Sequence, residues 1–168
     1  MSKLTALALS IAVLGGVWAF LALNPLATVA LVWVGFIAWG CYFATGADDA
    51  ALKKTIAGMS FGAVMAAIAL ALVSGGALGG LGALGAPVII AVTVFPLVAA
   101  SSVNLLSAVP ANVYGYAATA GLGLTAGTAG NAAAMDLSNP AVLVIISTVL
   151  GAVFGMVSGK LAGSLGGK

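Results

Sequence analysis

Only 5% of the 168 residues are charged, whereas 63% are hydrophobic. A soluble domain carries about 25% charged residues, so this composition excludes a water-soluble fold. It predicts an all-α, polytopic membrane protein whose first partner is the lipid bilayer. The net charge of +2 is too small and too dispersed for nucleic acid, so no nucleic-acid partner is expected. The single cysteine excludes an internal disulfide.

Six stretches are long and apolar enough to cross a bilayer, which takes about 20 residues. The first is longer than the apolar core of about 7–15 residues in a secretory signal peptide, so we expect a transmembrane helix that ends at Asn24-Pro25. The whole chain, residues 1–168, is predicted to form a single transmembrane domain. Its six helices are expected at about residues 4–23, 26–44, 55–73, 87–106, 108–127 and 140–161.

Prolines and glycines mark the boundaries of the later helices. The glycine-rich residues 74–87 are predicted to form a loop, and they lack the flanking strand that a phosphate-binding loop requires. Pro96 predicts a kink in the fourth helix. Pro110 and Pro140 suit the first turns of the fifth and sixth helices, where a missing N–H costs nothing.

The lysines predict the orientation, because cytoplasmic segments of membrane proteins are rich in Lys and Arg. With six spans and a cytoplasmic N-terminus, every lysine falls on the cytoplasmic side: Lys3, Lys53, Lys54, Lys160 and Lys168. The pair Asp48-Asp49 then lies in a solvated cytoplasmic loop beside Lys53 and Lys54, and only Asp136 lies outside. Five spans would move one terminal lysine to the outside. Both termini are therefore predicted to be cytoplasmic.

Small residues recur at intervals of four on three of the predicted helices, which places them along one helix face. In lipid, such faces let two helix backbones approach closely. They predict tight packing within one subunit or between the subunits of a homo-oligomer. The candidate packing residues are Gly58, Gly62, Gly115, Gly151, Gly155 and Gly159.

A related pattern of a small residue, two variable residues, an aromatic residue and glycine occurs at residues 58–62, 111–115 and 151–155. The third and sixth helices are the last helices of two halves, residues 1–73 and 87–164. One interpretation is an inverted repeat of three plus three helices, which is common in channels and transporters. The other is chance recurrence, because small residues are frequent and the rest of the halves aligns poorly.

Uncharged polar residues gather around the junction of the fourth and fifth helices. One interpretation is a cytoplasmic turn with hydrogen bonds between helices. The other is the polar lining of a solute path, with Asn104, Ser107, Asn112, Tyr114 and Thr119 as candidate pore or solute-binding residues. The aromatic second helix leaves a similar choice, because Trp39 suits either core packing or an aromatic constriction in a pore.

Two of these segments carry a resemblance to a known family. The aromatic stretch Trp33-Val34-Gly35-Phe36 and the segment LLSAVPANVYGYAATAG, residues 105–121, are its most specific parts. The chain resembles the bacterial inner-membrane family of unknown function 1097 from Gly15 to about Gly159. The resemblance implies a small polytopic protein of the bacterial cytoplasmic membrane, and it implies no activity and no functional residues.

Enzymatic activity is not expected, because the chain has no histidine and no paired carboxylates within a span for acid–base chemistry. No cofactor is expected, and no recognisable set of metal ligands is present. We predict a channel or facilitator for a small neutral solute of the urea, glycerol or amide kind. The alternatives are a non-transporting structural or accessory membrane subunit, and a secondary transporter without intramembrane charge.

Overall fold

The computed structural model describes residues 1–166, and over that range it consists of helices joined by turns. The α-helices are α1 (Lys3–Leu23), α2 (Val32–Ala44), α3 (Asp49–Ser74), α4 (Gly85–Ala99), α5 (Val109–Thr125) and α6 (Pro140–Leu165). Short 3-10 helices are η1 (Gly79–Leu84), η2 (Ala100–Ser102), η3 (Asn104–Leu106) and η4 (Ala129–Asn131). The predicted all-α class is confirmed, and Lys168 lies outside the described residues.

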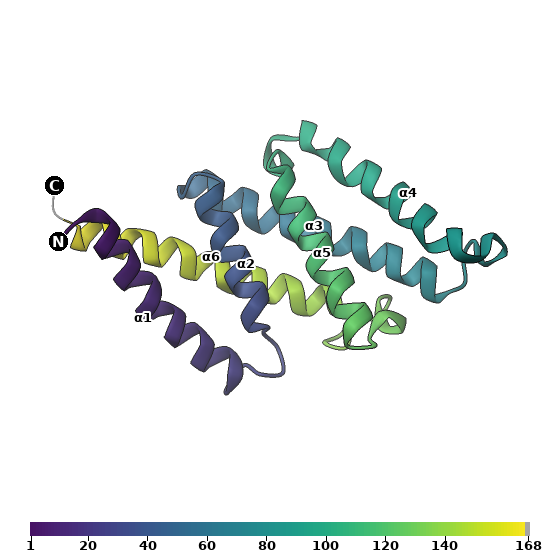
Figure 1. Cartoon of the computed structure of the whole chain (residues 1–168), viewed down its shortest axis with the longest axis horizontal. Helices are drawn as coiled ribbons and strands as arrows, with labels where there is room; N and C mark the ends of the chain where they lie inside the picture. The colour runs from purple at the N-terminus through teal and green to yellow at the C-terminus, as the bar shows by residue number, and fades with distance from the viewer. Residues whose placement is uncertain (167–168) are drawn as a thin grey trace.

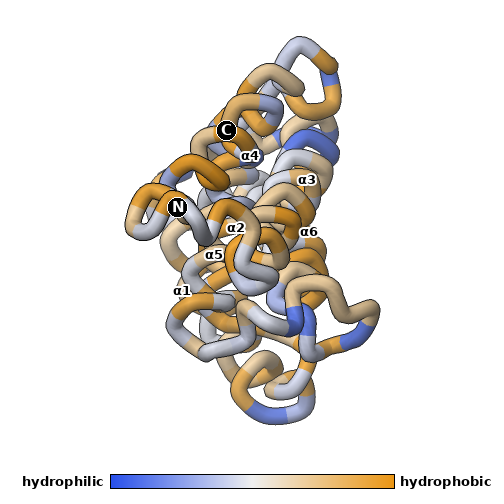
Figure 2. Tube along the Cα trace, turned by 90° about the vertical axis from the view of Figure 1, so that its right-hand side faces the viewer, coloured by the Kyte–Doolittle hydropathy of each residue, from blue (hydrophilic) through white to orange (hydrophobic). Residues whose placement is uncertain are grey.

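The helices present an apolar exterior that suits lipid. Among residues 1–166, four helical stretches are long and apolar enough to cross a membrane, namely Lys3–Leu23, Asp49–Ser74, Gly79–Ser102 and Pro140–Leu165. Large apolar side chains such as Phe20 and Phe95 are 64% and 76% exposed. Figure 2 shows the hydrophilic segments mainly at turns and helix ends. Apolar exposure on this scale is stable in a bilayer, so the chain is a membrane protein.

The second helix is shorter than predicted, because α2 begins at Val32 and not at residue 26. The preceding segment forms turns, and Leu31 is extended, with φ of −108° and ψ of 115°. At 1.5 Å per residue the 13 residues of α2 rise about 20 Å, less than the hydrocarbon thickness of about 30 Å. If this part of the chain crosses the membrane, the turns before α2 therefore have to supply the remaining length.

The third helix is longer than predicted, because α3 begins at Asp49 and not at residue 55. Lys53 and Lys54 thus lie in its first turns, which corrects their expected place in a loop. Asp48 starts the helix, since its carboxylate accepts a hydrogen bond from the Ala51 N–H at 2.6 Å. A helix of 26 residues is about 39 Å long, so its charged end can extend beyond the hydrocarbon core.

The starts of α5 and α6 follow their prolines, whereas the ends of α4 and α6 differ from the predicted positions. α4 begins at Gly85 with Pro96 inside it, but it ends at Ala99 and not at residue 106, and η2 and η3 take its place. α5 and α6 have proline in the first turn, as predicted. α6 extends beyond the predicted residue 161 to Leu165.

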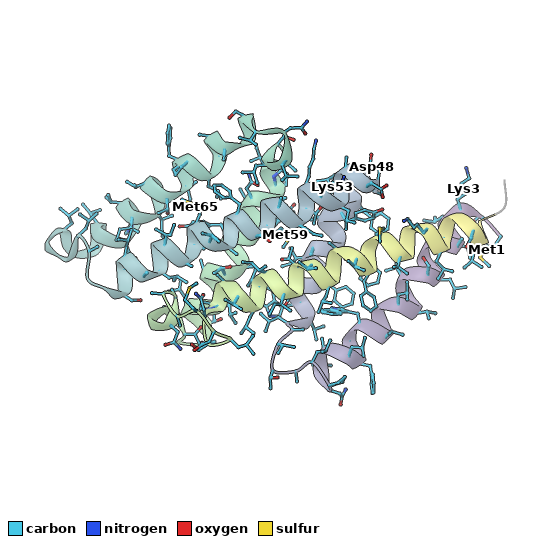
Figure 3. The ribbon with its side chains drawn as sticks, turned by 180° about the vertical axis from the view of Figure 1, so that it is seen from behind. Met1, Lys3, Asp48, Lys53, Met59 and Met65 are labelled. Carbon is cyan, nitrogen blue, oxygen red and sulfur yellow. The ribbon has the colours of Figure 1, made fainter. Side chains whose placement is uncertain are left out.

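The helices interlock between the two halves of the chain. α3 and α6 run side by side through the middle of the molecule, as Figure 3 shows from behind. α1 and α2 pack mainly against α6, whereas α4 and α5 pack mainly against α3. In Figure 1, α2 crosses α6 and α5 crosses α3, with α1 and α4 at opposite sides of the molecule. The last helix of each half is therefore covered by the first two helices of the other half.

The buried positions of corresponding helices have the same spacing. In α2 they are Val34, Gly35, Ala38, Trp39, Cys41 and Tyr42, and in α5 the same spacing gives Ala111, Asn112, Gly115, Tyr116, Ala118 and Thr119. In α3 they include Ala51, Thr55, Gly58, Met59 and Gly62, and in α6 the same spacing gives Val144, Thr148, Gly151, Ala152 and Gly155. Each crossing thus uses the same set of helix positions in both halves.

Glycines bring α3 and α5 into backbone contact. A methyl group added at Gly115 would overlap the carbonyl group of Met59, and one at Gly62 would lie 2.7 Å from the Tyr116 nitrogen. A methyl group at Gly58 would lie 2.7 Å from the β-carbon of Ala111. Real β-carbons do not approach so closely, so this crossing accepts no larger residue without movement of a helix.

The crossing of α2 over α6 is built in a similar way. A methyl group at Gly151 would overlap the backbone of Gly35, and one at Gly155 would lie 3.1 Å from ring atoms of Trp39 and Tyr42. Gly159 is less restricted, because a methyl group there would meet Phe43 at an ordinary 3.7 Å. The tightest contact in this crossing is therefore at Gly151.

Replacing Gly115 by alanine tests the α3–α5 crossing. We expect the free energy of unfolding to fall by about 1–3 kcal/mol, because overpacking outweighs the gain in helix propensity of about 1 kcal/mol. Gly121→Ala is the matched control on the same helix, since no neighbour lies within 4 Å of its added methyl group. Equilibrium unfolding in mixed micelles measures both, and equal stabilisation of the two variants would contradict the close contact.

Candidate functional site

A groove between α2 and α5 is an uncharged hollow on the surface of the helical domain. Its volume is about 460 Å³, within the range of small-molecule sites. None of its nine lining residues is charged. They are Trp33, Phe36, Ile37, Gly40, Cys41 and Ala44 of α2, and Tyr114, Ala117 and Ala118 of α5. We call this hollow the α2–α5 groove.

The groove combines half-exposed aromatic rings with small side chains. Trp33, Phe36 and Tyr114 are 43%, 41% and 41% exposed. Within residues 1–166, neither the Trp33 Nε1–H nor the Tyr114 hydroxyl has a hydrogen-bond partner. The groove therefore offers an indole donor, a phenol that donates and accepts, and apolar contact surface. These groups can select a ligand by shape and hydrogen bonding but not by charge.

Side chains from α1 and α6 hold the start of α2 beside the groove. Trp18 donates from Nε1 to the Val32 carbonyl oxygen at 3.0 Å. Ser147 accepts a hydrogen bond on its hydroxyl oxygen from the Leu31 N–H at 2.8 Å. The Leu31 N–H precedes the first helical turn and needs such a partner at membrane depth, because the hydrocarbon offers none. Ser147 therefore satisfies the backbone where α2 begins, and Trp18 joins α1 to the same point.

Trp39 is buried behind the groove and does not line it. Its side chain is 3% exposed, and its Nε1 donates to the Ser158 hydroxyl oxygen at 3.0 Å. Its ring stacks on Phe36, with 5.8 Å between the centroids, and Phe154 lies 5.9 Å away on α6. Trp39 therefore supports the Phe36 wall of the groove through packing.

Asn112 is fully buried where α4 ends and α5 begins. Its Nδ2 donates to the carbonyl oxygen of Leu97 at 3.2 Å and to that of Leu106 at 3.0 Å. Leu97 lies in the last turn of α4, and Leu106 is the last residue of η3. The side chain therefore joins α5 to the end of α4 and to the short 3-10 helix that follows it. Its Oδ1 has no partner among the described residues.

The other predicted pore residues lie in separate places. Asn104 and Ser107 are exposed in the turns between α4 and α5, and Asn104 lies beside Lys53 and Lys54. Thr119 is fully buried in α5, and its hydroxyl has no partner among the described residues. The structure thus does not bring the six predicted residues into one site, and Tyr114 alone among them lines the groove.

Sequence reasoning missed the small residues that form the floor of the groove. Gly40 and Ala44 are four apart on α2, and Ala117 lines the α5 side, with Gly121 four residues further along that helix but outside the lining. Gly40 and Gly121 have no neighbour within 4 Å of an added methyl group, so neither glycine is needed for packing within the chain. The four-residue spacing of small residues is the signal that could have found these positions in the sequence.

The candidate site has no features of a metal centre. In the part of the chain that the structure describes, no three His, Cys, Asp or Glu side chains are grouped to hold a metal ion. Cys41 is the one potential soft ligand in the groove, and its sulfur accepts a hydrogen bond from the Thr55 hydroxyl at 3.7 Å. Its surroundings are those of a packed side chain.

The chain belongs to the family described as "Protein of unknown function (DUF1097)", whose model matches residues 8–163. This match confirms the resemblance and extends it at both ends beyond Gly15 and Gly159. No curated protein and no solved structure matches the chain. The functional argument therefore depends on the geometry of the groove.

A structural role for Asn112 predicts a loss of stability on replacement by leucine. Asn112→Leu removes the donor from the buried bond to the Leu97 carbonyl and from the part-buried bond to the Leu106 carbonyl, and we expect the free energy of unfolding to fall by about 1–3 kcal/mol. Asn104→Leu is the matched control, because Asn104 is exposed in a turn. Unfolding in mixed micelles compares the two variants. Equal midpoints for both would show that the Asn112 amide is not a structural link.

Proposed function

We propose that the protein is a channel or facilitator for a small uncharged solute, with the α2–α5 groove as the solute-binding surface. The observation that carries the proposal is the groove itself. It contains an unpaired phenol and indole, small residues along its floor and no charged side chain. A neutral ligand that donates and accepts hydrogen bonds, such as urea, glycerol or a short amide, matches these groups.

We further propose that residues 1–74 and 85–165 form an inverted repeat of three helices each. Two observations support this. The last helix of each half packs against the first two helices of the other half, and the buried residues of corresponding helices have the same spacing. By the same correspondence, Ile37, Gly40 and Cys41 of α2 pair with Tyr114, Ala117 and Ala118 of α5. The groove would then lie where the repeats meet, which is where transporters of this type bind their solutes.

We also propose a six-span topology in the bacterial cytoplasmic membrane with both termini in the cytoplasm. Lys3, Lys160, Asp48 and Asp49 surround one cavity, and Lys53 lies at the same end of the α3–α6 pair (Figure 3). A positive end of this kind favours the cytoplasmic side. The short α2 would cross together with the turns before it, where the N–H groups of Leu26, Ala27, Val29, Ala30 and Leu31 are bonded within the protein.

The topology predicts opposite labelling of two exposed turns. In a Cys41→Ala background, we expect Asn104→Cys to react with an impermeant maleimide only from the cytoplasmic side. Ala133→Cys, in the turn before α6, should react only from the outside. Labelling of spheroplasts and inverted vesicles makes the comparison. Reaction of both cysteines from the same side would contradict six spans.

The solute path predicts a loss of flux when the groove is filled. We expect Gly40→Leu combined with Ala117→Leu to bring solute entry into proteoliposomes down to the rate of empty liposomes. Leucine favours helix more than glycine, no neighbour lies within 4 Å of a methyl group added at Gly40, and Ala117 is exposed. Swelling in urea, glycerol and acetamide measures the flux.

Gly16→Leu is the control for this experiment, because Gly16 is exposed on α1 and no neighbour lies within 4 Å of its added methyl group. It should retain the flux of the unaltered protein. If the unaltered protein gives only the rate of empty liposomes with every solute, the facilitator is excluded. Co-purification of a stoichiometric partner would then favour the accessory-subunit alternative.

A secondary transporter without intramembrane charge is the second candidate, and the proposed repeat favours it. Two inverted halves can move relative to one another around a site between them. Saturable uptake that is accelerated by solute on the opposite side would distinguish this mechanism from a channel. In both cases the absence of charge from the groove disfavours direct coupling to protons through the bound solute.

A further inference from the structure

A second hollow, separate from the α2–α5 groove, lies at the lysine-rich end of the molecule. It has a volume of about 610 Å³ and lies between the start of α1, the end of α2 and the last turns of α6. Lys3 and Lys160 contribute ammonium groups to its lining, and Asp48 and Asp49 contribute carboxylates. We call it the zwitterion cavity because it presents two charges of each sign.

The four charged groups retain capacity for a ligand. Within residues 1–166, no ion pair of 4 Å or less joins either lysine to either aspartate. Asp48 uses one carboxylate oxygen to accept the Ala51 N–H, which leaves its other oxygen free. A purely anionic ligand would meet the two carboxylates, and a purely cationic ligand would meet the two lysines. A ligand with one charge of each sign avoids both conflicts.

The apolar part of the lining indicates how such a ligand would be held. Leu7 of α1 and Phe43 of α2 contribute apolar walls, and Gly159 and Gly163 of α6 form a floor without side chains. α1 and α2 each pack mainly on α6, so these apolar walls stand on a shared support. The charged groups at the helix ends lie at the depth of lipid headgroups if α1 and α6 cross the bilayer.

We propose that the zwitterion cavity binds a phosphoethanolamine group, with the phosphate between Lys3 and Lys160 and the ammonium at Asp48 and Asp49. The source that the apolar walls favour is the headgroup of a phosphatidylethanolamine lipid, with an acyl chain against Leu7 and Phe43. Lysine ammonium groups bind phosphate oxygens, and carboxylates accept the N–H bonds of a primary ammonium. This inference does not depend on the proposed solute path.

Competition between lipids tests the headgroup. The purified protein is given equal amounts of phosphatidylethanolamine, phosphatidylcholine and phosphatidylglycerol in micelles, and native mass spectrometry counts the lipids that remain bound. We expect phosphatidylethanolamine to exceed each competitor by about fivefold, the upper range for exposed charge pairs. Choline has no N–H donor, and glycerol has no positive charge, so each competitor lacks one half of the recognition.

Two double variants separate the halves of the headgroup. Asp48→Asn with Asp49→Asn should abolish the preference for ethanolamine over glycerol, and asparagine retains the helix cap. Lys3→Gln with Lys160→Gln should lower the binding of all three phospholipids. The matched control is Lys53→Gln with Lys54→Gln, which removes the same charge at the same end of the molecule but outside the cavity. The control should keep the fivefold preference.

A second arm uses free phosphoethanolamine and isothermal titration of the protein in detergent. Binding of the free compound with no preference among lipids would assign the same site to a soluble zwitterion. The proposal is overturned if neither arm shows binding that depends on both pairs of charges. It is also overturned if the Lys53 and Lys54 control loses binding to the same extent as the Lys3 and Lys160 variant. Helical circular dichroism confirms the fold of each variant.

Discussion

Two helix crossings with almost no side chain between the backbones determine the arrangement of this protein. α5 meets α3 at Gly115, and α2 meets α6 at Gly151. Lipid chains are as apolar as the helices, so association in a bilayer depends on close van der Waals contact. These crossings place α2 and α5 on the long α3–α6 pair, and that placement leaves the groove between the two shorter helices. Larger residues at the crossings would therefore alter the groove through the backbone.

Close packing creates a second requirement, because the shorter helices begin and end inside the assembly. The start of α2 and the end of α4 leave backbone groups without helical partners, and hydrocarbon cannot bond to them. Ser147 meets this need at the start of α2, and Asn112 meets it near α4. The buried polar side chains thus stabilise broken helices beside the groove. Their burial at membrane depth is therefore explained by bonds to the backbone, with no contact with a solute required.

The sequence predicted the features that depend on local composition. The helical class, the apolar segments and the first turns of α5 and α6 follow from hydropathy and from Pro110 and Pro140. The start of α2 could not be predicted in this way, because the partner of the Leu31 N–H is Ser147, which is far along the chain. The sequence indicates Asn112 as a candidate pore residue, but an amide at membrane depth suits both a pore lining and a structural hydrogen bond. Only the positions of the Leu97 and Leu106 carbonyls distinguish the two roles.

The uncharged groove also constrains how any solute path is completed. Trp33 and Tyr114 are each more than two-fifths exposed, so in an isolated protomer lipid chains would cover their rings. A polar solute does not displace lipid from a surface that remains open to the bilayer, because its hydrogen-bonding groups lose water there. A channel along this groove therefore needs a second wall. The small residues Gly40 and Gly121 let another helix approach closely, and a second copy of the chain can supply that helix. The channel mechanism thus requires a neighbouring helix at this face, which a homo-oligomer would supply, whereas an accessory subunit would use the same face to hold a different partner.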